Sequence, residues 1–158
     1  MDLAASVTAF AQEAQQFCDW LERDNSRDEL TVARRLAHLY ARGLDLPDVD
    51  PEQLAGFGTP PLPEALMQNV MASLTAVPFQ YYWEVFDSVR PQADVPVCGD
   101  LVDDLRDTYS DVKKGLLAYQ QGHRVLAAWH WRTTCGFHWG RHVASALKAL
   151  ASYERPAS

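Results

Sequence analysis

The chain has 158 residues, of which 47% are hydrophobic and 22% are charged, and its formal net charge is −7 at pH 7. This length suits one globular domain with a substantial core, and the balance of apolar and charged residues is ordinary for such a domain. The negative charge argues against general binding to nucleic acid or to an anionic membrane, because both need a basic surface.

The cysteines and the hydropathy pattern indicate the compartment. Cys18, Cys98 and Cys135 are odd in number and form no Cys-x-x-Cys pair, so we expect reduced, structural thiols. The first residues lack the basic region of a secretion signal, and no apolar run approaches the roughly 20 residues of a membrane span. We therefore expect a cytoplasmic protein.

Helical periodicity recurs along the chain and is interrupted by proline-containing loops. In chain order we expect helices at about 4–23, 28–42, 63–76, 79–88, 100–120 and 124–153, with loops at 45–63 and 90–99. The first of these loops is interpreted as a plain connection, although Phe57 at its centre could fold back onto the domain. The pattern predicts an all-α, single-domain fold over residues 1–158, with a tail that frays from about residue 153. This fold is an irregular bundle of about five or six helices around a long C-terminal helix.

An acidic stripe marks the helix that begins near residue 100. Asp100 follows a glycine and has the character of an N-cap, and Asp103 resembles its capping-box partner. At roughly 100° per residue, Asp104, Asp107 and Asp111 continue from Asp100 as a stripe beside the apolar face. Clustered carboxylates at the border of a core need cations.

The C-terminal helix supplies candidate cations. His138 and His142 lie one turn apart, with Arg141 between them. Gly136 and Gly140 weaken this helix and allow a break near Gly136. Because a short turn makes the two helices antiparallel neighbours, we expect Asp104 or Asp107 to contact a basic residue of the last helix.

Aromatic residues surround these histidines along the helix. Trp129, Trp131, Phe137 and Trp139 point nearly all round the axis, which is typical of a buried helix. A second aromatic run, at 79–87, is typical of a core or an interface.

Residues 100–116, DLVDDLRDTYSDVKKGL, followed by WHW at 129–131 and HWGRH at 138–142, resemble a bacterial domain family of unknown function, DUF5063. Its members follow the pattern LADDLxDIYxDLKxGL and then HWGxH. Val102, Thr108 and Val112 depart from this pattern with Val for Ala, Thr for Ile and Val for Leu, and all three are compatible with a helix. The resemblance extends over about residues 10–150, supports the helical fold and implies no activity.

Catalytic signatures such as a phosphate-binding loop or a Gly-x-Ser-x-Gly elbow are missing from the sequence. We therefore expect a binding or adaptor module for an unknown protein partner. It would have no catalytic activity and no cofactor, and would be a monomer or a small homo-oligomer. The polar residues that would form its network or site are Asp100, Asp103, Asp104, Asp107, Asp111, Trp131, His138, Trp139, Arg141 and His142.

Metal binding is the alternative to this interpretation. Two histidines at i, i+4 on one helical face can chelate a metal, and nearby carboxylates can complete the site. In this hypothesis the protein is a hydrolase dependent on magnesium or a transition metal, with Asp104, Asp107, His138 and His142 as ligands. An ordinary network of ion pairs and hydrogen bonds explains the same residues without a metal.

Overall fold

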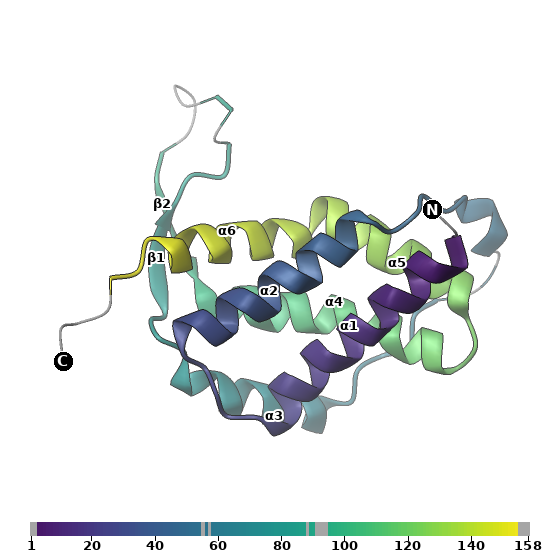
Figure 1. Cartoon of the computed structure of the whole chain (residues 1–158), viewed down its shortest axis with the longest axis horizontal. Coiled ribbons are helices and arrows are strands. Elements are labelled where there is room, and N and C mark those ends of the chain that lie inside the picture. Colours follow the sequence, from purple (N-terminus) through teal and green to yellow (C-terminus); the bar gives the residue numbers. More distant parts are fainter. Residues whose placement is uncertain (1–2, 55, 57, 88, 91–94, 155–158) are drawn as a thin grey trace.

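The computed structural model describes residues 3–54, 56, 58–87, 89, 90 and 95–154 (Figure 1). Within these ranges six α-helices, two short 3₁₀ helices and one antiparallel pair of strands follow in chain order. They are α1 (Leu3–Arg23), α2 (Glu29–Leu44), η1 (Pro51–Leu54), α3 (Glu64–Ser73), η2 (Leu74–Ala76), β1 (Tyr81–Glu84), β2 (Val97–Asp100), α4 (Leu101–Gln120), α5 (Arg124–Phe137) and α6 (Trp139–Ala151). Phe57 and the tail at 155–158 lie outside the described residues.

Helix α4 lies at the centre of the helical body, where it packs against α1, α5 and α6 (Figure 1). Its apolar stripe is buried as the periodicity predicts, with Leu105, Val112 and Leu116 at most 2% exposed. Asp100 is the N-cap that the sequence indicates, because its carboxylate accepts hydrogen bonds from the backbone N–H groups of Val102 and Asp103. None of the described helices has both the length and the apolar character needed to cross a lipid bilayer.

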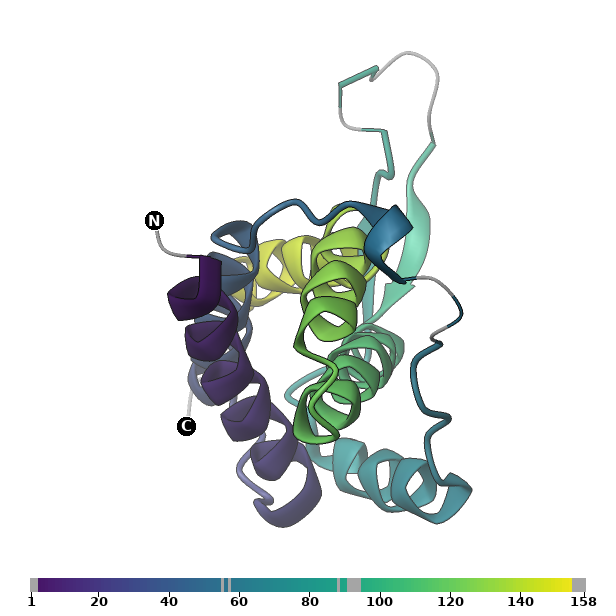
Figure 2. The same cartoon turned by 90° about the vertical axis from the view of Figure 1, so that its right-hand side faces the viewer.

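A β hairpin occupies the region where the sequence predicted a helix at 79–88 and a loop at 90–99, so the all-α prediction is wrong in this part. Strand β1 pairs antiparallel with β2, with Tyr81 opposite Asp100 and Tyr82 opposite Gly99. Tyrosine and tryptophan favour strands, and exposure alternates along β1 as in a strand with one covered face. The hairpin stands at the edge of the helical body (Figures 1 and 2) and leads directly into α4.

The long C-terminal helix is also broken in two. At His138 the backbone leaves the helical region (φ −130°, ψ −91°), so α5 ends at Phe137 and α6 begins at Trp139. Gly140 permits this break, because a Cβ there would lie 2.1 Å from the carbonyl oxygen of Cys135. The change of direction lets α6 pack against α2 and α4.

The break also changes which aromatic side chains are buried. Trp131 and Trp139 are fully buried, whereas Phe137 is 58% exposed and Trp129 is half-buried. The expectation of a helix buried on all sides is therefore wrong, because α5 and α6 each keep an outward face.

Candidate metal centre

A cleft of about 1350 Å³ lies between the hairpin, the start of α4 and one face of α6. Its wall includes Tyr82 and Glu84 from β1, Asp104 from α4, His138 at the break before α6 and His142 from the first turn of α6. Strand β1 thus brings residues far from α6 in the sequence to the same cleft.

Two buried aspartates of α4 each bind one histidine. His142 Nδ1 lies 2.8 Å from Asp104 Oδ1, and His138 Nδ1 lies 2.6 Å from Asp111 Oδ2. The Asp104 and Asp111 side chains are only 8% and 10% exposed. The contact of Asp104 with His142 is the one predicted between the acidic stripe and the last part of the chain, whereas the contact of Asp111 with His138 was not predicted. With Nδ1–H donating to a carboxylate, a neutral imidazole keeps its lone pair on Nε2.

Asp107 lies between these two pairs on the same helix. Its Oδ2 is 3.6 Å from His142 Nε2, and its Oδ1 accepts a hydrogen bond of 3.0 Å from Arg106 Nε. The Arg106 guanidinium also pairs with Asp103, at 2.7 Å. Arg106 therefore holds one oxygen of Asp107 and leaves the other facing the histidines.

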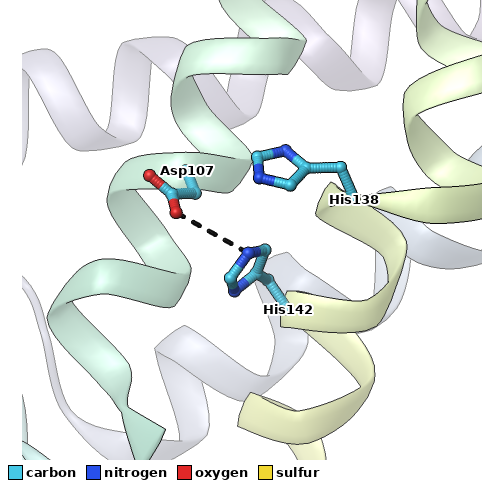
Figure 3. A group of neighbouring side chains, drawn as sticks. All are labelled: Asp107, His138 and His142. Atoms are coloured by element: carbon cyan, nitrogen blue, oxygen red, sulfur yellow. Dashed lines mark ion pairs between the residues drawn. The ribbon is translucent and has the colours of Figure 1, made fainter.

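Asp107, His138 and His142 form a set that could share one cation. Figure 3 shows that one nitrogen of each ring points into the space beside the Asp107 carboxylate. The ring centroids are 4.9 Å apart, and one ligand atom from each of the three residues lies within 4.8 Å of the others. Ligand atoms at about 2.1 Å from one metal lie at most about 4.2 Å apart, so a small inward movement would be enough.

Electrostatics distinguish the histidines near this set. The hydrogen bond to Asp104 raises the pKa of His142, and this effect exceeds the opposing effect of burial. His130 on α5 behaves in the opposite way, because its burial lowers its pKa while its Nε2 lies 3.0 Å from the Asp111 carbonyl oxygen. Neutral His130 therefore donates to the backbone of Asp111 and fixes the residue that holds His138.

Several predicted site residues lie outside the Asp–His cluster, by which we mean Asp104, Asp107, Asp111, His138 and His142. Asp100 acts as a cap and accepts a hydrogen bond from Gln80. The Trp131 and Trp139 indoles are buried and donate to the carbonyl oxygens of Val112 and Trp131, so they support the core. Arg141 is exposed and lies on the wall of the cleft.

Tyr82 is a residue of this site that the sequence interpretation missed. Its hydroxyl donates a hydrogen bond of 2.5 Å to Asp104 Oδ2, and its pKa is raised first by burial and then by this bond. Glu84, on the same face of β1, accepts a hydrogen bond from Ser145 of α6. The alternation of a strand would have put Tyr82 and Glu84 on one side, but the run was interpreted as a helix.

Fold and cluster together describe a mainly helical protein with an Asp–His cluster that contributes Asp104, His138 and His142 to the wall of a cleft. The model of a domain of unknown function, DUF5063, matches residues 2–155, so the chain belongs to this family, as the resemblance of its motifs predicted. No curated protein matches the sequence.

One solved structure supports the fold. The crystal structure of protein BF1032 from Bacteroides fragilis superposes with a TM-score of 0.73 over 97% of this chain and 96% of that chain, at 21% sequence identity. At this identity the likeness concerns the fold alone.

Proposed function

We propose that this protein binds a divalent transition metal through Asp107, His138 and His142 and acts as a metal-dependent hydrolase. The observation that carries the proposal is that a second side chain holds each of these three. Asp111 holds His138, Asp104 holds His142, and Arg106 holds the far oxygen of Asp107. Metal-binding histidines usually donate their other ring N–H to a carboxylate, which fixes the tautomer and the ring orientation.

The donor set favours a transition metal over magnesium or calcium. Imidazole nitrogens suit zinc, iron and nickel, whereas magnesium and calcium prefer oxygen ligands. The three carboxylates of the Asp–His cluster give it negative charge, of which Arg106 compensates only part because Asp103 shares its guanidinium. A divalent cation would neutralise the remainder.

The setting favours a catalytic site over a structural one. Structural zinc sites have four protein ligands, whereas catalytic sites have three and keep a position for water or substrate. The His138 and His142 side chains are 41% and 29% exposed and line the cleft, so a substrate could reach the metal. A redox-inert metal at such a site supplies a hydroxide nucleophile near neutral pH.

Metal analysis of protein purified without a polyhistidine tag tests this proposal. We expect about one equivalent of metal, and a visible Co²⁺ spectrum when cobalt is added to the chelator-treated protein. Asp107→Asn and His142→Gln should weaken Co²⁺ binding by about 100-fold or more, because each removes a ligand. His38→Gln is the matched control, because His38 is exposed on α2. Wild-type protein without metal and without a Co²⁺ spectrum would contradict the metal site. If the resident metal were iron, only the proposed hydrolytic chemistry would be contradicted, and the metal site would stand.

A second candidate function is the non-catalytic binding module that the sequence analysis favours. The observation in its favour is the exposure of Trp83 and Phe86 in the hairpin region, at 77% and 75%. Large exposed apolar side chains gathered in one region are typical of interaction surfaces.

Affinity capture from native lysate tests this second function. Wild-type protein should retain a partner that the double variant Trp83→Ala/Phe86→Ala loses, while the metal content of both stays equal. Leu44→Ala is the control, because Leu44 is 57% exposed at the end of α2. Repeated failure of the wild type to retain any partner would count against this role.

A further inference from the structure

We infer that Tyr82 of the β hairpin is a positioning residue for the metal centre, so that metal binding and the placement of the hairpin are coupled. This inference rests on the proposed metal site. In this role Tyr82 acts on His142 through Asp104.

The coupling passes through the Asp104 carboxylate, each oxygen of which accepts one hydrogen bond. Asp104 Oδ2 accepts the Tyr82 hydroxyl at 2.5 Å, and Asp104 Oδ1 accepts His142 Nδ1 at 2.8 Å. A carboxylate held at both oxygens has little freedom to rotate about its side-chain bonds. The position of Tyr82 therefore helps to set the direction in which the His142 ring points.

Pairing of the two strands sets the position of Tyr82 itself. Gly99 lies opposite Tyr82 in the ladder, and a Cβ at Gly99 would be 2.5 Å from the Tyr82 ring carbon Cζ. The tyrosine ring can thus lie across the backbone of β2 only because residue 99 has no side chain. The register of the hairpin and the position of the hydroxyl are therefore linked.

A second bond fastens the same face of β1 to α6. Glu84, two residues after Tyr82, accepts a hydrogen bond from the Ser145 hydroxyl, which lies one turn beyond His142 on α6. The alternate residues Tyr81 and Trp83 face outward and are 64% and 77% exposed. The inner face of β1 is thus bonded to both helices that carry the Asp–His cluster.

Thermodynamic coupling works in both directions. If the hairpin restrains His142 in the orientation that a metal requires, then a bound metal must restrain the hairpin to the same degree. Metal should therefore slow hydrogen exchange in β1 and β2. Removal of the Tyr82 hydroxyl should weaken metal binding and uncouple the hairpin from it.

Tyr82→Phe tests this inference, because it removes the hydroxyl and keeps the ring. We expect Co²⁺ and Zn²⁺ affinity about tenfold lower than wild type, at the lower end of the range for outer-shell partners. We also expect metal to slow hydrogen exchange of the hairpin amides in the wild type and not in the variant. Tyr81→Phe is the matched control on the same strand, since its ring faces outward. It should behave as the wild type in both measurements.

Gly99→Ala is a second variant that keeps the hydroxyl and displaces the ring, and it should also weaken metal binding. Wild-type affinity and wild-type exchange in Tyr82→Phe would overturn the inference and leave the metal site standing. A wild-type protein that binds neither ion would overturn both, so the two failures are distinguishable. Circular dichroism of each variant shows whether the helical fold is intact.

Discussion

Helix α4 carries charged side chains on two opposite sides, and the buried charges on the two sides are compensated differently. Toward α1, Tyr109 and Lys113 both bind Glu22 Oε1, at 2.8 and 2.6 Å; we call these three residues the Glu22 cluster. Toward α6 lie the aspartates of the Asp–His cluster, about half a turn away at roughly 100° per residue.

The Glu22 cluster is closed. One cation meets one carboxylate, the Lys113 and Glu22 side chains are 10% and 14% exposed, and a tyrosine hydroxyl completes the contacts. The Asp–His cluster has more carboxylates than cations, two half-exposed imidazoles and a cleft beside it. This difference indicates that buried charge forms a candidate site where lone pairs remain available to a ligand, and a structural contact where a buried cation meets its carboxylate directly.

The largest expected effect on stability lies in the Glu22 cluster. Lys113→Met leaves Glu22 with a tyrosine hydroxyl as its partner, so the free energy of unfolding should fall by about 3 kcal/mol, as for other broken buried pairs. Urea denaturation measures this change. Lys114→Met is the control, because Lys114 directly follows Lys113 in the chain but is only half-buried. Equal stability of the two variants would show that the buried pair contributes little.

Metal affinity should respond to a substitution in the Asp–His cluster and not to one in the Glu22 cluster. Asp111→Asn replaces the carboxylate that holds His138, so Zn²⁺ affinity should fall by about 10- to 100-fold, as for other outer-shell partners. Calorimetric titration measures it. Lys113→Met, although less stable, should keep wild-type affinity when titrated under folding conditions. Equal loss in both variants would mean that metal binding reports general stability.

In metal-free protein, the contribution of His142 to the free energy of unfolding should fall as the pH rises. Its folded pKa is raised by the hydrogen bond to Asp104. Its contribution is therefore fully present below the unfolded pKa of about 6.5 and is lost as the pH rises through the folded pKa. Urea unfolding of wild type and His142→Gln across this range gives the difference. A difference that does not change with pH would contradict the ion pair.

Two comparisons sharpen this result. Saturating Zn²⁺ should reverse the sign, because protons compete with the metal for the imidazole and acid then destabilises the protein. His130→Gln should also give the opposite slope, because burial lowers the pKa of His130. The stability that neutral His130 contributes falls as the pH drops below about 6.5.

The smallest expected effect comes from Asp103, which shares Arg106 with Asp107 but lies at the surface. The Asp103 side chain is 51% exposed, so Asp103→Asn should lower the free energy of unfolding by less than about 0.5 kcal/mol. Zn²⁺ affinity should stay at the wild-type value, in contrast to Asp107→Asn. A marked loss of affinity in Asp103→Asn would show that Arg106 needs both carboxylates to hold Asp107.

Much of the helical fold was predictable because it depends on local spacing, and so was the alignment of the aspartates and of the two histidines of the site. The 3.6-residue period aligned Asp104, Asp107 and Asp111 on one side of α4, and the N-cap at Asp100 follows from its position before an apolar run. The spacing of four between His138 and His142 keeps their rings close, at 4.9 Å, although the helix breaks at the first of them.

What the sequence determined by itself, then, is the part of the protein in which neighbours along the chain are neighbours in space: most of the helices, the N-cap at Asp100 and the acidic stripe. The tertiary structure decided the rest. Residues 81–84 became a strand because 97–100 lie beside them, and aromatic residues fit either a strand or a buried helix until that partner is present. The same long-range pairing brought Tyr82 to Asp104, and the packing of α6 on α4 matched each aspartate to its histidine. No local period encodes these contacts, because they join segments 22 to 38 residues apart.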